Sequence, residues 1–216
     1  MWRTLLTVGT LAMLGATASA LAEEQKEAEP IQAVWKPQEI TFYYQSFTTY
    51  YSCESLESKL EQILRQVGAQ AEVRVRSVDC GRGPARLPRA EIRLIAPVEA
   101  TPEALAELKK GQSVRELVAR VSGRRDVVAN LEKPFLARWE RVTVGRGRGG
   151  LEAGDCELLE QVRRQILPKL AVRVIEDNTP CPPNSPGLTR PSLVVEALIK
   201  VPEPDEVAPK SGAREK

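Results

Sequence analysis

The residues best placed to do chemistry in this sequence are its four cysteines, Cys53, Cys80, Cys156 and Cys181. Thiols can serve as redox pairs, as thiolate metal ligands or as halves of structural disulfides. No Cys-x-x-Cys occurs, and the intervals of 27, 76 and 25 residues lack the close pairing of a zinc ribbon. The spacing therefore favours structural disulfides over a metal or redox site.

Histidine is absent from the sequence. Its absence excludes Ser-His-Asp and Cys-His relays and every zinc site that uses imidazole. The 31 Lys and Arg residues nearly balance 29 Asp and Glu, and a formal charge of +2 gives no bulk attraction for nucleic acid. We therefore expect no catalytic residue, no cofactor, no metal and no nucleic-acid partner.

Residues 145–150 read Gly-Arg-Gly-Arg-Gly-Gly, which formally matches the G-x-G-x-x-G pattern of dinucleotide sites. In such sites the helix opens directly on the glycines, so that its N–H groups meet the pyrophosphate. Here Leu151 to Asp155 intervene before the next expected helix. The pattern therefore indicates a surface loop.

A basic segment runs from Arg120 to Arg148, with eight positive and three negative residues. Such a surplus could receive an anionic partner, such as a lipid head group, a phosphorylated polymer or an acidic protein face. The alternative is a solvated face offset by acidic neighbours, which the near-zero total charge favours. The candidate contacts in this segment are Arg138, Arg141, Arg146 and Arg148.

Aromatic residues gather between Phe42 and Tyr51, which include all four tyrosines and two of the three phenylalanines. Strand alternation would place Ile40, Phe42 and Tyr44 on one face and Tyr43 on the other. The following loop carries Phe47, Tyr50 and Tyr51, which could form an exposed platform for a glycan, peptide or protein. Packing in the core is the competing role, and the need for bulk in a small core favours it.

These residues lie within an internal repeat. Cys53-Glu54-Ser55-Leu56-Glu57 recurs as Cys156-Glu157-Leu158-Leu159-Glu160, and Gln62-Ile63-Leu64 recurs as Gln165-Ile166-Leu167, both at an offset of 103. A Val-Arg-Val segment, a second cysteine and a strand-like run follow in each unit. The repeat predicts two similar β-α-β-β halves, at about 39–97 and 140–200.

Apolar spacing places a helix in each half. In the first, five apolar residues from Leu56 to Val67 share one face, and Gly68 follows as a C-terminal signal. A similar stripe starts at Leu159 in the second. Two short helices within 101–123 should link the halves, with Thr101 opening the first, Gly111 ending it and Ser113 capping the next. We expect an α+β fold, with a six-stranded antiparallel sheet and the repeat helices on one face.

The expected lengths of the helix and the strand in each half predict the disulfide pairing. A helix from Cys53 to Val67 spans about 21 Å, and a strand returning from Glu72 to Cys80 covers about 26 to 30 Å. If each strand runs antiparallel to its helix, the pairs are Cys53–Cys80 and Cys156–Cys181. Each bridge would contribute on the order of 3 to 3.5 kcal/mol to stability.

The N-terminal segment is typical of an exported protein. A charged start, an apolar run from Leu5 to Leu14 and alanines up to Ala22 predict a signal peptide over 1–22, with an uncleaved anchor as the alternative. An acidic leader (23–34), a single domain (35–200) and a disordered proline-containing tail (201–216) follow. With no further long apolar run, we expect no spanning segment after signal removal and a periplasmic or secreted location.

The stretch from Trp35-Lys36-Pro37 to Thr48-Thr49-Tyr50-Tyr51-Ser52-Cys53 resembles exported proteobacterial proteins of unknown function. The resemblance extends through Thr101-Pro102-Glu103 and Gly154-Asp155-Cys156. It implies no activity, ligand or site residue.

The function we expect is therefore that of a non-catalytic envelope protein, a binding or interaction module whose contact surface is the basic segment or the loop Gln45 to Ser52. Its partner would be an envelope protein or an anionic polymer. Two alternatives stay open. A histidine-free cell-wall hydrolase predicts a deep cleft with converging carboxylates, and a structural accessory subunit predicts an exposed apolar patch without a pocket.

Overall fold

The computed structural model describes residues 28–45, 47–122, 131, 133–145, 151–179 and 191–202. Six strands form one antiparallel sheet: β1 (Ile31–Tyr43), β2 (Gln70–Arg76), β3 (Arg89–Glu99), β4 (Phe135–Val144), β5 (Val172–Asn178) and β6 (Ser192–Lys200). The helices are α1 (Cys53–Gln66), α2 (Pro102–Ser122) and α4 (Cys156–Gln165). The predicted α+β class is confirmed.

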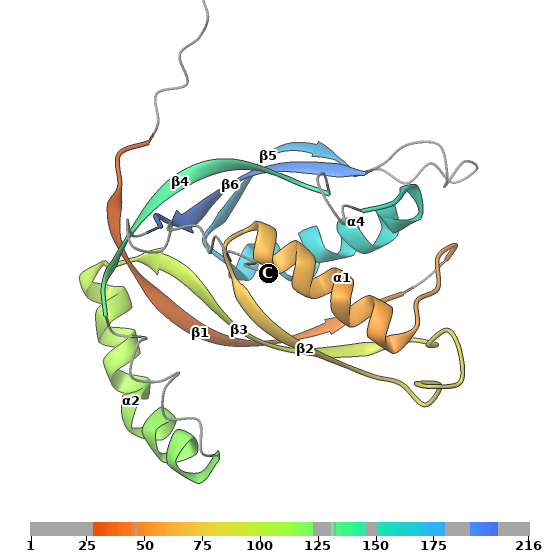
Figure 1. The fold of residues 1–216 in the computed structure, drawn as a ribbon, viewed down its shortest axis with the longest axis horizontal. Helices are drawn as coiled ribbons and strands as arrows, with labels where there is room; N and C mark the ends of the chain where they lie inside the picture. Colours follow the sequence, from red (N-terminus) through yellow and green to blue (C-terminus); the bar gives the residue numbers. More distant parts are fainter. Residues whose placement is uncertain are drawn as a thin grey trace, which may run out of the picture.

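The strands follow the spatial order β2-β3-β1-β4-β6-β5, so the first three strands lie on one side of the sheet and the last three on the other. The two sets are joined by strand pairing between β1 and β4, through Ile31↔Ala137, Gln32↔Leu136 and Ala33↔Phe135. Beyond these pairs the two strands separate. The sheet therefore opens into a trough (Figure 1).

Both α1 and α4 lie in this trough, between the two sets of strands (Figure 1). Their apolar side chains join those of the strands in one core, which includes Leu56 and Leu60 of α1 and Leu159 of α4. The predicted alternation in β1 is confirmed, because Ile40, Phe42 and Tyr44 are buried and Tyr43 is exposed. Both repeat helices thus cover the same, concave face of the sheet.

The end of α1 confirms its predicted boundary. Gly68 follows the helix with φ +81°, a conformation that residues with a Cβ rarely adopt. A Cβ at this position would lie 2.8 Å from the carbonyl oxygen of Leu198 in β6. Glycine therefore lets the turn after α1 pack directly against the backbone of the second set of strands.

The disulfide prediction is confirmed for Cys53 and Cys80, whose Cα atoms lie 5.6 Å apart. This bridge joins the first turn of α1 to the loop after β2. No described cysteine has a free thiol. The predicted partner of Cys156, which is Cys181, lies outside the described residues, so the second bridge stays a prediction.

The predicted start of the folded domain is wrong. Strand β1 starts at Ile31, inside the segment predicted as a solvated leader, and Ala33 and Val34 are fully buried. The reason is that this short stretch pairs with β3 on one side and β4 on the other, a tertiary effect that composition does not reveal.

The link between the halves is one helix, α2, and not the two that were predicted. It continues through Gly111, which costs only about 1 kcal/mol in a helix interior. The Arg115 side chain folds back over Gly111 to donate to the Leu108 carbonyl, and a Cβ at Gly111 would collide with its guanidinium. Because an arginine side chain can move aside, glycine is not required here; it is tolerated within the helix and does not end it.

Candidate interaction surface

Two loops lie together at one end of the molecule, on the right in Figure 1. One joins β1 to α1 (residues 44–52) and the other joins β2 to β3 (residues 77–88). They carry four large apolar side chains that are 57% to 89% exposed, and we call these the apolar rim: Phe47, Tyr50, Val78 and Leu87. Sequence analysis found the first two but missed Val78 and Leu87, which no local pattern marks.

The two loops are fixed to each other. The Cys53–Cys80 disulfide links them covalently. The Ala85 N–H donates to the Tyr51 carbonyl at 2.8 Å, and the Tyr44 N–H donates to the Pro88 carbonyl at 3.1 Å. The rim residues are therefore attached to backbone that is held in place.

A buried carboxylate from the other half of the chain supports the first loop. Glu157, in the first turn of α4, is 7% exposed. It accepts hydrogen bonds from the backbone N–H groups of Phe47 and Thr48, each at 3.1 Å, and from the Thr48 hydroxyl at 3.0 Å. A charged acceptor for two neighbouring N–H groups fixes the backbone beneath Phe47.

Two glutamines of α4 complete this support. Because β1 has separated from β4, the end of β1 lacks a neighbouring strand on that side. The Gln161 side chain accepts from the Gln45 N–H at 2.9 Å and donates to the Gln45 carbonyl at 2.7 Å. Gln165 makes the same pair of bonds with Tyr43, at 3.1 and 2.9 Å. Side-chain amides thus replace a missing strand. The repeated Gln-Ile-Leu segment contains Gln165, but no sequence pattern marked Gln161.

Asp155 holds a second buried polar cluster. It is 2% exposed and accepts from the Tyr51 hydroxyl at 2.5 Å, the Lys59 ammonium at 2.7 Å and the Glu152 N–H at 2.7 Å. Burial, followed by the hydrogen bond to Asp155, raises the pKa of the Tyr51 hydroxyl. Tyr51 therefore acts as a neutral donor at ordinary pH.

Tyr51 does not belong to an exposed platform, although the sequence placed it there as a candidate contact. It is 6% exposed, and its ring packs on that of Tyr44 at 5.2 Å between centroids. The competing interpretation, packing, holds for Tyr51, whereas Phe47 and Tyr50 are exposed. The aromatic loop thus divides its residues between core and surface.

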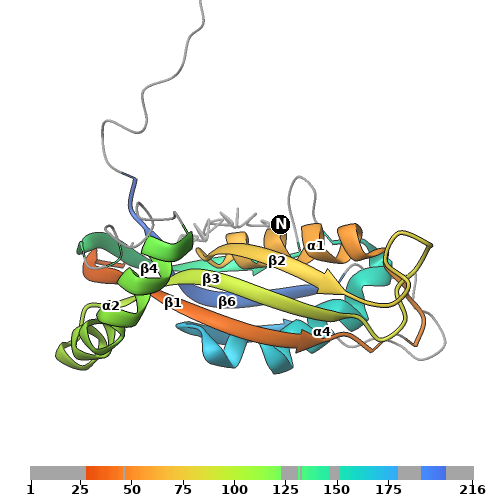
Figure 2. The same cartoon turned by 90° about the horizontal axis from the view of Figure 1, so that it is seen from below.

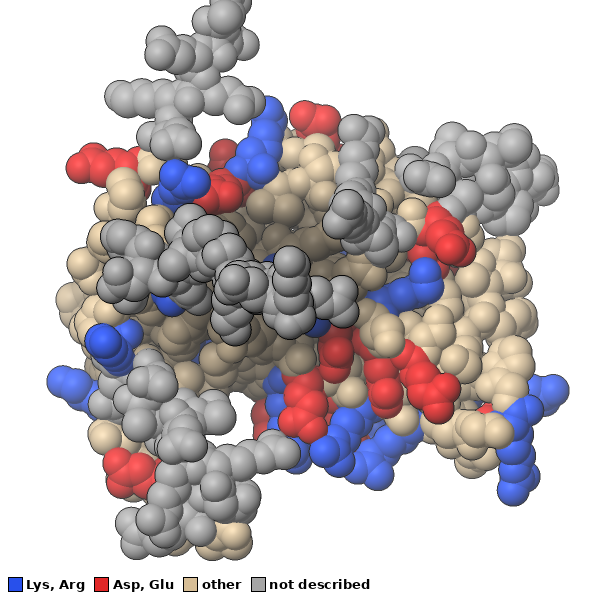
Figure 3. Space-filling view, viewed as in Figure 1, with Lys and Arg blue, Asp and Glu red and all other residues tan. Residues whose placement is uncertain are grey.

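The basic segment offers little unpaired charge among its described candidates. Arg138 pairs with Glu140 at 2.6 Å and Arg141 with Glu176 at 3.6 Å. Arg146 and Arg148 lie outside the described residues. Figure 3 shows places where Lys and Arg lie beside Asp and Glu, and others at the left and lower right where basic side chains have no acidic neighbour in this view. The ion pairs of Arg138 and Arg141 are the offset charges of the solvated alternative.

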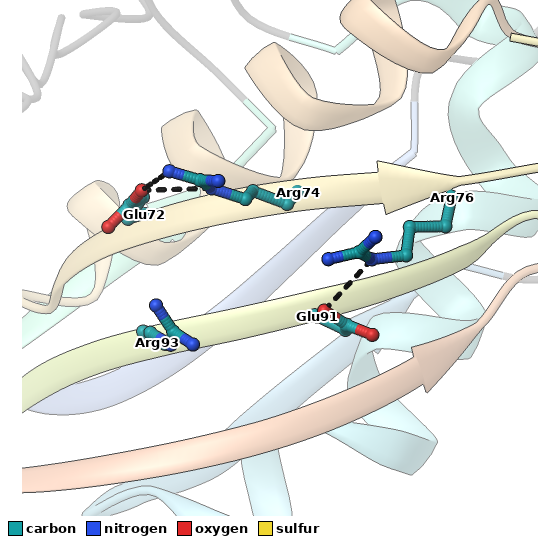
Figure 4. A pocket seen from close by; sticks show the side chains of 5 residues that line it. All are labelled: Glu72, Arg74, Arg76, Glu91 and Arg93. Atoms are coloured by element: carbon teal, nitrogen blue, oxygen red, sulfur yellow. Dashed lines mark hydrogen bonds and ion pairs between the residues drawn. The ribbon is translucent and has the colours of Figure 1, made fainter.

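A shallow pocket on the outer face of β2 and β3 is lined by Glu72, Arg74, Arg76, Glu91 and Arg93 (Figure 4). Its arginines are engaged by neighbouring carboxylates, with Arg74–Glu72 at 2.8 Å and Arg76–Glu91 at 3.1 Å. Hydrogen bonds from Arg89 and then Arg76 lower the pKa of the Glu91 carboxyl. These mutual ion pairs make the pocket a charge ladder across the strands.

Two buried carboxylates that could do acid–base chemistry are occupied by the fold. Asp155 and Glu157 are buried and bonded to loop and side-chain donors. Within the described residues, no group of three or more Cys, Asp or Glu residues is placed to hold a metal ion. No helix in the same part of the chain is long and apolar enough to cross a membrane.

No protein family model, curated protein or solved structure matches this chain.

Proposed function

We propose that the protein is a non-catalytic interaction module of the cell envelope, and that the apolar rim is its contact surface for a protein partner. The observation that carries the proposal is that exposed apolar side chains sit on loops fixed by a disulfide and by the buried carboxylate of Glu157. Pre-ordered loops lose less conformational entropy on binding.

The chemistry of the rim favours a protein over an anionic polymer. Phe47, Tyr50, Val78 and Leu87 offer aromatic and aliphatic surface, which is the composition of interface centres. A polymer would instead need unpaired cations, and the described arginines of the basic segment are paired. The hydrolase alternative is less well supported, because the carboxylates of Asp155 and Glu157 are buried beneath the loops.

We infer in addition that the chain consists of two related halves. The element order β-α-β-β occurs twice, and the strand order places the two sets symmetrically about β1 and β4. This topology supports a second bridge, Cys156–Cys181, and disulfides support an oxidising compartment reached through the predicted signal peptide. Peptide mapping without reduction tests the bridge, and a Cys156 peptide joined to any other cysteine would contradict it.

The proposed function is tested by comparing two baits. The chain is expressed with its own N terminus in a bacterial host, purified from the envelope and immobilised. The rim variant carries Phe47→Gln and Leu87→Gln. The matched control carries Val114→Gln and Leu117→Gln, which removes two exposed apolar residues at the other end of the molecule. Envelope proteins retained by each bait are quantified by mass spectrometry.

We expect at least one envelope protein to be retained by the unmodified chain and the control, and to be depleted about tenfold or more by the rim variant, since two buried interface residues are worth more than the 1.4 kcal/mol of a tenfold change. Equal retention by all three baits would exclude the rim as the contact. Release of soluble fragments from purified cell wall would favour the hydrolase instead.

A further inference from the structure

Helix α2 extends away from the sheet at the end of the molecule opposite the apolar rim (Figures 1 and 2). Among its described side chains only Leu108 is buried. Its proximal half is tied to the sheet by an ion pair between Glu107 and Lys36 at 2.7 Å. The distal half, from Lys109 to Ser122, is attached to the rest of the protein mainly through the helix itself.

This distal half carries an apolar stripe of Val114, Leu117 and Val121, which are 60% to 83% exposed. At about 100° per residue, Leu117 lies half a turn around the helix from the buried Leu108. Val114 and Val121 lie within about 60° of Leu117 on the same count. The stripe therefore faces directly away from the protein body, where no described element covers it.

Positive charge accompanies the stripe. The distal half contains Lys109, Lys110, Arg115 and Arg120 against one acidic residue, Glu116. Lys109 and Lys110 are exposed, and Lys110 lies one turn before Val114 in line with the stripe. The acidic residues Glu103 and Glu107 belong to the proximal half, where Glu107 already has its partner.

We propose that the distal half of α2 lies in the surface of an anionic lipid bilayer. Val114, Leu117 and Val121 would enter the boundary between head groups and acyl chains, while the exposed Lys109 and Lys110 contact the head groups. Helices that lie in a membrane surface combine an apolar face with flanking Lys and Arg in this way. Each basic residue near an anionic surface adds attraction, and the two signals together give binding that neither gives alone.

A second copy of the chain is the less suitable occupant. A stable protein interface buries about 800 Å² on each partner and uses about 20 to 30 residues a side. The stripe has three apolar residues on a helix that stands apart from other elements. Like charges from Lys109 and Lys110 would also approach each other in a symmetric helix pair. An anionic lipid surface complements both features.

The placement of α2 leaves the apolar rim free. Because α2 and the two rim loops lie at opposite ends of the molecule (Figure 1), a molecule bound to a membrane through α2 would present the rim on the side away from it. Lipid binding is thus separable from the proposed protein contact, and a variant at either end should leave the other function intact.

The test is flotation with lipid vesicles. Protein purified from the envelope is mixed with vesicles of equal phosphatidylglycerol and phosphatidylcholine, or of phosphatidylcholine alone. The stripe variant carries Val114→Gln, Leu117→Gln and Val121→Gln, because glutamine keeps a good helix propensity. Its matched control is the rim variant, Phe47→Gln and Leu87→Gln. All variants share one N terminus, so the apolar run from Leu5 to Leu14 cannot explain a difference among them.

We expect the unmodified chain and the rim variant to float with the anionic vesicles, and the stripe variant to bind at least about tenfold more weakly, since three apolar contacts are lost. Replacing Lys109 and Lys110 by Gln should weaken binding by about fivefold per charge. Equal flotation of the stripe variant, or equal binding to neutral vesicles, would overturn the proposal. So would a concentration-dependent dimer that the stripe variant abolishes in a protein that does not float.

Discussion

Helices α1 and α4 occupy matching positions in the order of elements, yet they use their polar residues differently. In α1, Glu57 and Glu61 accept from the Val75 and Val73 N–H groups at 2.7 and 3.1 Å and thereby cover the free edge of β2. In α4 the residue that matches Glu57 is Glu160, and it pairs with Arg164 instead. Helix α1 thus stabilises its own half of the sheet.

Helix α4 instead serves the other half of the chain. Its Glu157 is buried beneath the first loop, whereas the matching Glu54 of α1 is exposed. Some support also runs the other way, since Gln66 of α1 accepts from the Gly145 N–H at 3.1 Å and Lys59 of α1 donates to Asp155 at 2.7 Å. The comparison teaches that the first strand-to-helix loop receives support from both halves, as expected of a surface that must keep its shape.

The largest test of this comparison removes the covalent support. Replacing Cys53 and Cys80 by Ala opens a loop with a sequence separation of 27. The chain-entropy model predicts a loss of about 3.5 kcal/mol in the free energy of unfolding. Urea denaturation of the double variant and of the unmodified chain measures it. A loss below about 1 kcal/mol would show that the two loops are held by their hydrogen bonds alone.

A second test replaces each of the two matching acidic residues, Glu157 and Glu54, by glutamine. In Glu157→Gln the amide group can accept only one of the two loop N–H bonds and turns its own NH₂ toward the other, so we expect a loss of about 2 kcal/mol. Hydrogen exchange at Phe47 and Thr48 should accelerate as the loop loosens. The matched control is Glu54→Gln, which is exposed and should change the stability by less than about 0.5 kcal/mol. Equal effects at the two positions would contradict the asymmetry.

A third test uses pH and the neighbouring tyrosines Tyr50 and Tyr51. The folded-state pKa of Tyr51 is raised above its unfolded value, so the unfolded chain loses this proton first as pH rises. Its contribution to stability is full below about pH 10 and declines above it, by about 1.4 kcal/mol per pH unit. Tyr51→Phe should therefore flatten the fall in stability between about pH 10 and 11.

Tyr50→Phe is the control for this experiment, because the Tyr50 ring is exposed. It should keep the steep decline of the unmodified chain, measured as the urea midpoint at each pH. Identical profiles for the two variants would mean that the bond between Tyr51 and Asp155 is unimportant in solution.

Periodicity in the sequence was sufficient for the elements that pack against their own neighbours. The stripe from Leu56 to Val67 and the alternation around Phe42 each reflect one buried face, so helix α1 and the end of β1 could be predicted. The start of β1 at Ile31 could not, because its burial depends on pairing with β4 far along the chain. Gly111 misled because a glycine costs only about 1 kcal/mol in a helix interior and does not by itself end a helix.

The candidate surface was only half predictable. An aromatic loop is visible in the sequence, but Tyr50 and Tyr51 are neighbours of one type. Tyr51 is buried through its packing on Tyr44 and its hydrogen bond to Asp155 of the other half. Val78 and Leu87 join the rim because the disulfide and the Ala85–Tyr51 hydrogen bond bring their loop alongside. Contacts between distant segments, and not local composition, determine which residues the surface presents.

The smallest expected effect concerns the two sheet edges. Because glutamine can still accept one hydrogen bond, Glu57→Gln and Glu61→Gln should each cost only about 0.5 kcal/mol. They should nevertheless accelerate hydrogen exchange at the Val73 and Val75 amides, whose acceptors lose their charge. In the matched variant, Glu160→Gln, exchange along β5 should be unchanged, since Glu160 pairs with Arg164 and not with that strand. If β5 responded as β2 does, the two helices would protect their edges alike, and the specialisation of α4 for the first loop would have to rest on Glu157 alone.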